Sequence, residues 1–460
     1  MGESVQEMDT TTERGALMMD EKLVDLLVRG YGMHRELVER ATHALERTNR
    51  VSAKIDSVVA YNQAKVLEAF HHARVSENCL FGSTGYGYGD AGREKLDTLY
   101  ARVFRAEAAL VRSQFVSGTH AIACALNAAC HDSKVLICAT GTPYDSLLPV
   151  LGLSQPEPKV AATNVRVLVV PLDDTANMNV SRIVELCREH RASVFVQRSC
   201  GYEWRPSQSV ANIEWLIREI RAHSPDTRVV VDNCYGEFVE DVEPIEAGAD
   251  LVAGSLIKNP GGGLCASGGY IVGRRRLVEL AAERLTCPGI GAHVGSNPLG
   301  LRHLFQGFFM APSIVGQSLK GAVFAARFFA ELGFSVMPEY AEPRTDIIQG
   351  ISLGTPERVL SFCRGIQKGS AVDSFVRPVA GDLPGYEQQV VMAGGTFIQG
   401  SSIELSADAP MREPYAVYLQ GGLSSQHAIL GSLFAAHELM KLGHMPALLV
   451  DLPDSGKNRT

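Results

Sequence analysis

Lys258 and Asp232 are of types, and in positions, that could together hold a cofactor. Lys258 follows the apolar segment Leu251–Gly254, in the sequence Ser-Leu-Ile-Lys-Asn-Pro-Gly-Gly-Gly. Asp232 ends the apolar run Arg228–Asp232. A lysine can bind the aldehyde of pyridoxal phosphate (PLP) as a Schiff base, and an aspartate can keep its pyridine nitrogen protonated, so that the ring accepts electrons. The pair therefore predicts a PLP site.

This interpretation requires a particular charge state of each of the two side chains. Only a neutral amine attacks an aldehyde, so we expect burial and neighbouring positive charge to lower the pKa of Lys258. A buried carboxylate at Asp232 needs a cationic partner, which the protonated ring would supply. The alternatives are a lysine in a surface turn and an aspartate that caps a helix or forms a turn.

A third motif could bind the phosphate of such a cofactor. Ser117, Gly118 and Thr119 precede an alanine-rich helical pattern. Free backbone N–H groups at a helix start bind anions, and a glycine lets the backbone approach them closely. The hydroxyl of Ser255, three residues before the lysine, is a further candidate ligand. The alternative is an ordinary helix cap, since serine and threonine are frequent there.

Tyr144 follows the apolar run Val135–Ala139 and is placed to stack on a pyridine ring. A turn tyrosine with a solvated hydroxyl is the alternative.

Two other motifs carry less weight. Gly87–Gly92 matches G-x-G-x-x-G, but no strand precedes it, so a dinucleotide site is not expected. Ser255 to Lys258 matches the S-x-x-K motif of serine acyl-enzymes, but its Ser-Asp-Asn and Lys-Thr-Gly partners are missing.

The composition is that of a soluble globular protein. Of 460 residues, 46% are hydrophobic and 20% charged, and the net charge of −8 argues against binding to nucleic acid. Ten cysteines at irregular spacings indicate reduced thiols, and no metal-ligand spacing occurs, so we predict no metal. The acidic N-terminus has no signal-peptide core, and no run of about 20 apolar residues predicts a membrane span. We therefore expect a cytoplasmic protein.

The order of the predicted elements indicates an α/β fold. Apolar, β-branched runs alternate with helical patterns such as Val180–His190 and Asn212–Ala222, which predicts a mostly parallel sheet that binds ligands at the carboxyl ends of its strands. The runs are Val135–Ala139, Val165–Val170, Val194–Gln197, Val229–Asp232, Leu251–Gly254 and Gly269–Val272.

We divide the chain into four parts by changes in this pattern. Residues 1–20 are predicted to be a flexible tail, and 21–92 a helical arm with a glycine-rich segment. Residues 93–312 form the predicted large domain. Residues 313–453 form a smaller α+β domain, with a long helix at Gly316–Leu332, strands at Phe375–Pro378, Val390–Ala393 and Phe397–Leu405, and a last helix at Ser424–Leu442.

Three segments resemble a known family. Val230–Glu240, Ala253–Gly263 and Gly395–Ser406 are similar to the methionine gamma-lyase-like proteins often called aluminium resistance proteins. That group resembles the Cys/Met-metabolism enzymes of PLP fold type I, and the likeness runs from about Leu23 to Pro453. It implies an aspartate-aminotransferase-like fold, a small C-terminal domain, and a homodimer or homotetramer.

The resemblance also implies roles for particular residues. Lys258 would bind PLP and shuttle protons, and Asp232 would pair with the ring nitrogen. The groups that would stack on the ring or hold the phosphate are Tyr144, Ser117, Gly118, Thr119 and Ser255. A neighbouring subunit would contribute a Tyr-x-Arg segment, for which this chain offers only Tyr86, Tyr88 and Arg93. An arginine would clamp the substrate carboxylate, with Arg412 the first candidate and Arg377 the second.

Together these features predict a PLP-dependent carbon–sulfur lyase acting on a small sulfur-containing amino acid. Lys258 would remove the α-proton, and Tyr86 or Tyr88 would protonate the leaving thiol. The alternatives are another PLP reaction (transamination, aldol cleavage or racemisation) and a PLP-fold protein with a non-catalytic role in stress or metal tolerance.

Overall fold

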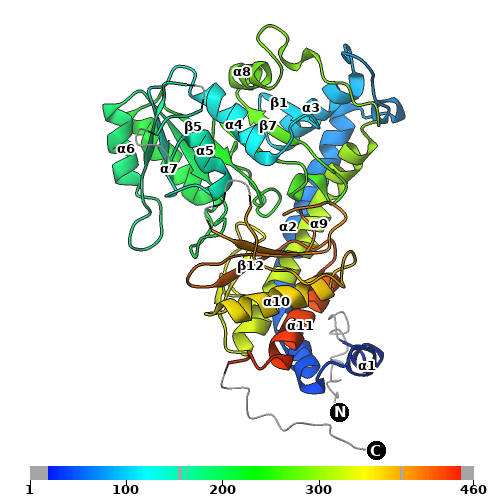
Figure 1. Ribbon diagram of the computed structural model, residues 1–460. Helices are drawn as coiled ribbons and strands as arrows, with labels where there is room; N and C mark the ends of the chain where they lie inside the picture. Colours follow the sequence, from blue (N-terminus) through cyan, green and yellow to red (C-terminus); the bar gives the residue numbers. More distant parts are fainter. Residues whose placement is uncertain (1–18, 154–157, 162, 384–385, 387, 447–460) are drawn as a thin grey trace, which may run out of the picture.

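The computed structural model describes residues 19–153, 158–161, 163–383, 386 and 388–446. A large and a smaller domain are connected by two long helices, α2 (Arg35–Ala73) and α9 (Arg302–Glu331), which pack side by side along the molecule (Figure 1). The predicted tail lies outside the described residues, except for Met19 and Asp20.

A seven-stranded sheet forms the centre of the large domain, in the order β1-β7-β6-β5-β4-β2-β3. From β6 to β3 the neighbouring strands are parallel, whereas β7 is antiparallel to both β6 and β1. The strands are β1 (Ala108–Arg112), β2 (Val135–Cys138), β3 (Arg166–Val169), β4 (Ala192–Gln197), β5 (Arg228–Asp232), β6 (Leu251–Ser255) and β7 (Gly269–Gly273). The predicted mostly parallel sheet is confirmed.

The register of this sheet places the predicted site at one edge. Asp232, the last residue of β5, lies opposite Gln197 at the end of β4 and Ala253 near the end of β6. Because parallel strands present their carboxyl ends at the same edge, the loops that follow β4, β5 and β6 converge there. The continuous valine run of β5 is buried, as expected for a strand covered on both faces.

Helices cover the sheet between its strands. The N-terminus of α4 (Gly118–Ala129) is capped by Ser117, whose hydroxyl accepts the His120 N–H at 3.1 Å, and this helix packs on β5, β6 and β7. The other helices of this domain are α3 (Ala91–Val103), α5 (Leu148–Leu151), α6 (Val180–Glu189), α7 (Val210–His223) and α8 (Arg275–Leu285).

The smaller domain has an antiparallel sheet in the order β10-β11-β12-β9-β8. Its elements are β8 (Ser335–Met337), β9 (Gln349–Ser352), α10 (Pro356–Lys368), β10 (Val390–Ala393), β11 (Ser406–Pro410), β12 (Ala416–Gln420) and α11 (Ser425–Lys441). The strands predicted at Phe375–Pro378 and Phe397–Leu405 are wrong, because both segments are loops. The N–H groups of Phe397 and Ile398 donate to the Glu404 carboxylate, which replaces pairing with a strand.

The N-terminal arm is interrupted where the sequence predicted continuous helix. A short helix, α1 (Glu21–Asp25), continues as a π-helical turn at Leu26–Gly30 before α2 begins. Gly32, with φ of +68°, supplies the left-handed conformation needed between them.

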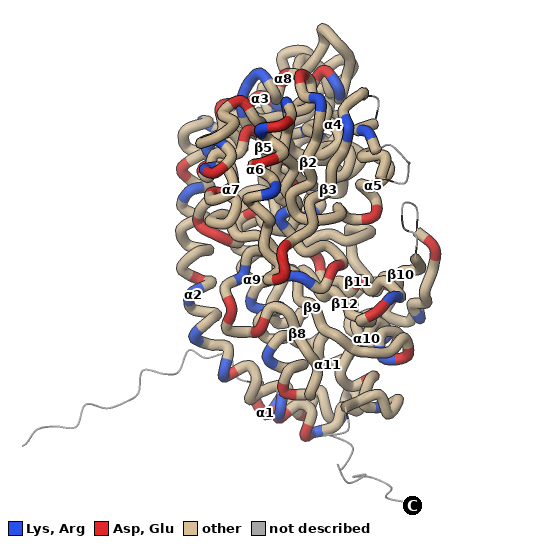
Figure 2. The backbone as a smooth tube through the Cα atoms, turned by 90° about the vertical axis from the view of Figure 1, so that its left-hand side faces the viewer, with Lys and Arg blue, Asp and Glu red and all other residues tan. Residues whose placement is uncertain are grey.

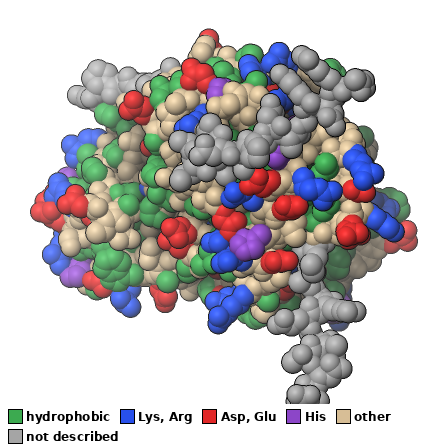
Figure 3. All heavy atoms as spheres, turned by 90° about the horizontal axis from the view of Figure 1, so that it is seen from below, with side chains coloured by type: hydrophobic (Ala, Val, Ile, Leu, Met, Phe, Trp, Pro, Cys, Tyr) green, Lys and Arg blue, Asp and Glu red, His purple; other side chains and the backbone are tan. Residues whose placement is uncertain are grey.

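Two buried apolar clusters form the cores of the domains, and they divide α9 between Val323 and Phe324. The predicted domain boundary at residue 313 therefore lies inside a continuous helix. Figure 2 shows that basic and acidic residues are interspersed along the chain in both domains, and side chains of both signs also occur on the face in Figure 3. Over residues 19–446, apart from the short gaps, no helix is both long and apolar enough to cross a membrane.

Candidate active site

A cavity of about 350 Å³ lies at the carboxyl edge of the large sheet, next to loops of the smaller domain. Mainly polar and aromatic residues line it. They include Ser117, Gly118, Thr119, Tyr144, Tyr202, Asp232, Tyr235, Ser255, Lys258, Ser267, Tyr386 and Ser401. The structure thus brings together seven predicted site residues that are spread over more than a hundred positions of the sequence.

Lys258 reaches this cavity from the turn after β6. The half-buried side chain places its Nζ atom 3.8 Å from the centre of the Tyr235 ring. Burial lowers the pKa of the amine, but Tyr235, Cys234 and Asp232 raise it more, so the net pKa is above its usual value. Our expectation of a lowered pKa for Lys258 is therefore wrong for the protein without a cofactor, because the groups around the amine are acidic and not positively charged.

Asp232 is buried at the end of β5 in the same cavity. Its Oδ1 atom accepts the N–H of Cys234 at 3.0 Å. Burial raises the pKa of the carboxyl, although the bond from Cys234 and the charge of Lys258 act in the opposite direction. A carboxylate that remains charged in such a position requires a cation, and a protonated pyridine nitrogen meets that requirement.

The N-terminus of α4 forms a small anion cradle beside β6. Gly118 packs so closely on this strand that an added Cβ would lie 2.9 Å from the Cβ of Ser255. The Thr119 hydroxyl lies 3.5 Å from that of Tyr144 and 3.4 Å from that of Ser146. N–H groups at the helix start, together with these hydroxyls, are the donors that a phosphate dianion needs.

Tyr144 is held where an aromatic ring could stack on a cofactor. Its backbone N–H donates to the side-chain oxygen of Gln197 at 3.0 Å. Burial, followed by the charge of Asp232, raises the pKa of its phenol, so the ring stays neutral.

The three candidates from the glycine-rich segment lie outside the cavity. Arg93 is buried, and its guanidinium donates to the carbonyl oxygens of Gly87, His293 and Gly295 at 2.8, 3.2 and 3.3 Å. Tyr86 and Tyr88 stack on each other with ring centres 5.4 Å apart, and are 72% and 70% exposed. Their predicted role concerns a neighbouring subunit and remains a prediction.

Neither candidate arginine for the substrate carboxylate lines the cavity. Arg412 donates to the carbonyl oxygen of Tyr202 at 3.2 Å and forms an ion pair with Glu203. It is therefore adjacent to a residue of the lining. Arg377 is exposed on a loop of the smaller domain. Both roles remain predictions.

Sequence reasoning gave no role to several tyrosines of the site. Tyr235 lies three residues after Asp232, and its φ of +70° is in the left-handed region. This conformation costs about 1 kcal/mol, and such strained residues are often found at functional sites. Tyr202 follows β4, so the carboxyl-end rule could have identified it. Tyr386 is brought to the cavity from the smaller domain, and no local pattern marks it.

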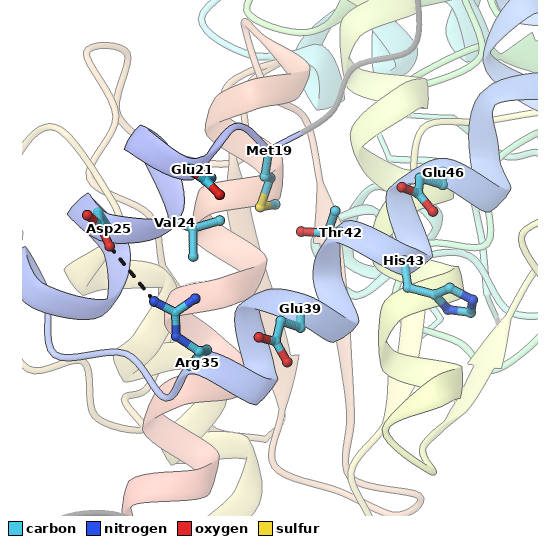
Figure 4. A pocket seen from close by; sticks show the side chains of 9 residues that line it. All are labelled: Met19, Glu21, Val24, Asp25, Arg35, Glu39, Thr42, His43 and Glu46. Atoms are coloured by element: carbon cyan, nitrogen blue, oxygen red, sulfur yellow. Dashed lines mark ion pairs between the residues drawn. The ribbon is translucent and has the colours of Figure 1, made fainter. Parts of the chain in front are cut away.

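A second hollow, of about 530 Å³, lies between α1 and α2 (Figure 4). Its carboxylates Glu21, Glu39 and Glu46 are exposed, and Arg35 already lies 3.8 Å from Asp25. In the part of the chain that the structure describes, no group of His, Cys, Asp and Glu is arranged to hold a metal ion. The chemistry is therefore concentrated at the edge of the large sheet.

The groups at this edge fit PLP. The α4 amides suit a phosphate, the buried Asp232 offers a counter-charge for a cationic ring, and Lys258 offers an amine in the same cavity. The fold and this site define the class: an aspartate-aminotransferase-like protein of PLP fold type I. The PLP-dependent protein YhfS from Escherichia coli, 14% identical, has the same fold with a TM-score of 0.54, over 83% of this chain and 97% of its own.

Within this class the chain belongs to the methionine gamma-lyase family, whose model matches residues 35–440. It is 42% identical to the uncharacterised protein YnbB of Bacillus subtilis, over 89% of this chain and 98% of YnbB. A solved structure from Clostridium acetobutylicum is 43% identical, with a TM-score of 0.88 over 92% of this chain and all of the other. Its name proposes a cystathionine beta-lyase involved in aluminium resistance. The family is one of PLP-dependent lyases.

Proposed function

We propose that this protein is a PLP-dependent carbon–sulfur lyase that acts on a sulfur-containing amino acid. The observation that carries the proposal is the presence of Lys258 and Asp232 in one cavity, next to the anion cradle of α4. Membership of the methionine gamma-lyase family and the name of the Clostridium relative support elimination over transamination, aldol cleavage or racemisation.

The residues of the cavity each have a defined task in this proposal. When bound, PLP supplies an electron-accepting ring that stabilises negative charge on the α carbon of an amino acid. The α4 amides and Ser255 hold the phosphate, and Asp232 holds the cationic ring nitrogen. Lys258 binds the cofactor and, once its amine is free and neutral, accepts the α-proton as a general base.

Tyr235 keeps the amine of Lys258 in position. Its ring lies under the Nζ atom, and its hydroxyl donates to the carbonyl oxygen of Ser401 at 3.3 Å, which links the lysine to the smaller domain. Burial raises the pKa of the phenol to about 12, so it serves as a neutral donor near pH 7.

We also propose that the protein acts in the cytoplasm as a homodimer. The exposed stacked pair of Tyr86 and Tyr88 supports this arrangement, since aromatic rings exposed to this degree are suited to contact a second subunit. Either tyrosine could then protonate a thiolate in the partner's cavity.

The proposal is tested with Lys258→Ala. The purified wild type should absorb at the edge of the visible range and release thiol and 2-oxo acid from at least one of cystathionine, methionine and cysteine. The variant should lose this absorbance band, and its turnover should fall by about 100-fold or more, as expected when a general base is removed.

The matched control is Lys54→Ala, which removes an exposed lysine of α2. It should retain both the band and the activity. A colourless Lys258→Ala protein that still converts substrate would overturn the assignment. A wild type that binds PLP but releases no thiol would leave the cofactor site in place and refute the lyase reaction.

A further inference from the structure

The loop that follows β5 has two sides. Three of its residues line the cavity, namely Asp232, Cys234 and Tyr235. Three others contact the guanidinium of Arg198, namely Asn233, Gly236 and Glu240. Arg198 directly follows β4 and is fully buried, and its backbone N–H donates to the carbonyl oxygen of Asp232 at 3.1 Å. One side of the loop thus faces the cofactor site, and the other side is attached to a single arginine.

Two of these contacts form at the ends of a tight turn. The N–H of Gly236 donates to the carbonyl oxygen of Asn233 at 2.8 Å, which closes a four-residue turn with Tyr235 at its third position. The φ of Tyr235 is +70°, a conformation that glycine usually supplies in turns. Nη1 of Arg198 donates to Oδ1 of Asn233 at 2.7 Å and to the carbonyl oxygen of Gly236 at 2.9 Å. One nitrogen atom therefore binds both ends of a strained turn.

Packing and charge keep the guanidinium of Arg198 in this place. A Cβ atom added to Gly236 would lie 2.5 Å from Nη1 and 2.6 Å from Cδ of Arg198, so glycine is needed beside it. Nη2 forms an ion pair with Glu240, and the carboxylate of Glu243 lies 3.9 Å from Nη1. Because a guanidinium presents its donors in a rigid plane, these contacts fix the loop relative to β4.

The turn places acidic and aromatic groups beside Lys258. The Nζ atom of Lys258 lies 3.8 Å from the centre of the Tyr235 ring, and the face of an aromatic ring stabilises a cation. Burial lowers the pKa of this amine, and three groups of the loop raise it by more: Tyr235, Cys234 and Asp232. Two groups of the smaller domain also interact with its charge, Asp408 and Tyr386. The position of the Tyr235 ring therefore contributes to the charge state of the amine.

We propose that Arg198 is a positioning residue, which binds both ends of the turn at residues 233–236 and so holds the ring of Tyr235 against the amine of Lys258. This inference rests on the proposed function and deepens it, since Lys258 must be neutral both to bind an aldehyde and to accept a proton. Arg198 acts through Tyr235 and not on the amine itself.

The test measures the titration of Lys258 in the apoprotein. Acetylation by acetic anhydride at a series of pH values, read by mass spectrometry of the peptide that contains residue 258, gives the midpoint at which the amine becomes neutral. Arg198→Lys keeps a positive charge beside Glu240 and Glu243 but lacks the planar donors that bind both ends of the turn. The midpoint should fall by about 0.5 to 1.5 pH units, the equivalent of a lost cation–π contact. A merely looser loop would change the maximal rate of acetylation and leave the midpoint in place.

A double-mutant cycle shows whether Arg198 acts through Tyr235. Tyr235→Leu removes the ring and should lower the midpoint by a similar amount, and Arg198→Lys added to it should cause a further change of no more than about 0.3 pH units. Gly236→Ala displaces the guanidinium without changing any charge and should give the same shift, which keeps the test open should Arg198→Lys fail to fold. Arg218→Lys, on the exposed side of α7, is the matched control and should keep the wild-type midpoint.

Midpoints equal to that of the wild type in Arg198→Lys and Gly236→Ala would overturn this inference and leave the lyase function intact. Additive shifts for Arg198→Lys and Tyr235→Leu would also overturn it, because Arg198 would then act on Lys258 by another route. A wild type that releases no thiol from cystathionine, methionine and cysteine would refute the proposed function. The titration involves no turnover, so it would still decide the positioning role.

Discussion

Replacing Gly118 with alanine is a direct test of the anion cradle. Gly118 is the first residue of α4, and its backbone does not need a left-handed conformation, so only packing opposes the new methyl group. The added Cβ would lie 2.9 Å from the Cβ of Ser255. Carbon atoms in favourable contact are about 3.5 to 4 Å apart, so α4 and β6 must separate by about 0.6 Å or more.

This separation predicts effects on both stability and cofactor binding. Overpacking a tight contact costs about 1 to 3 kcal/mol of unfolding free energy. Moving the α4 amides away from the phosphate weakens charge-assisted hydrogen bonds, each worth about 1.5 to 3 kcal/mol. Since about 1.4 kcal/mol is tenfold in affinity, PLP should bind about 10- to 100-fold more weakly.

Titration of the apoprotein with PLP, followed by absorbance, measures this change. Gly381→Ala is the matched control, because a Cβ there would meet no atom within 4 Å, and its affinity should equal that of the wild type. The reasoning is refuted if Gly118→Ala is folded and binds PLP within about twofold of the wild-type affinity.

Two further predictions concern buried carboxyl groups. Burial raises the pKa of Glu237 from 4.5 to about 8, while Tyr270 donates to it at 2.7 Å. The folded state thus holds a proton that the unfolded chain releases, and wild-type stability, relative to Glu237→Gln, should fall by about 3 kcal/mol between about pH 5 and pH 8. Urea unfolding at several pH values measures this, and a constant difference would contradict it. Asp232→Asn should lower kcat about tenfold or more, since it removes the charge facing the ring nitrogen; an unchanged kcat would exclude this pairing.

Much of the large domain could be predicted because its signals are local. Valine-rich runs such as β5 and the capped, alanine-rich α4 each carry their own pattern, and alternation of strands and helices predicts the parallel sheet. Lys258 and Asp232 were identifiable for the same reason, since Asp232 ends β5 and Lys258 follows β6, and the ends of both strands are visible in the sequence.

The smaller domain and its part of the site were harder to predict. β11 has the sequence Ser-Ala-Asp-Ala-Pro, whose residues disfavour strands, and it is held by pairing with β10 and β12. The more strand-like Phe397–Leu405 is a loop because Glu404 binds its N–H groups. The buried position of Asp408 therefore follows from neighbouring strands and not from its own segment.

The sequence alone determined the family, the mostly parallel sheet of the large domain without its edge strand β1, and the two residues expected to meet a cofactor. These features follow from patterns among residues that are close together in the sequence, and such patterns do not depend on tertiary contacts. Only the tertiary structure decided which other groups surround Lys258: the phenol of Tyr235, and the hydroxyls of Tyr202 and Ser401, which donate to Asp408. The pKa of Lys258 depends on Tyr235, Cys234 and Asp232, which the pairing of β5 with β6 brings beside it, and Ser401 joins them only when the smaller domain packs against the large one.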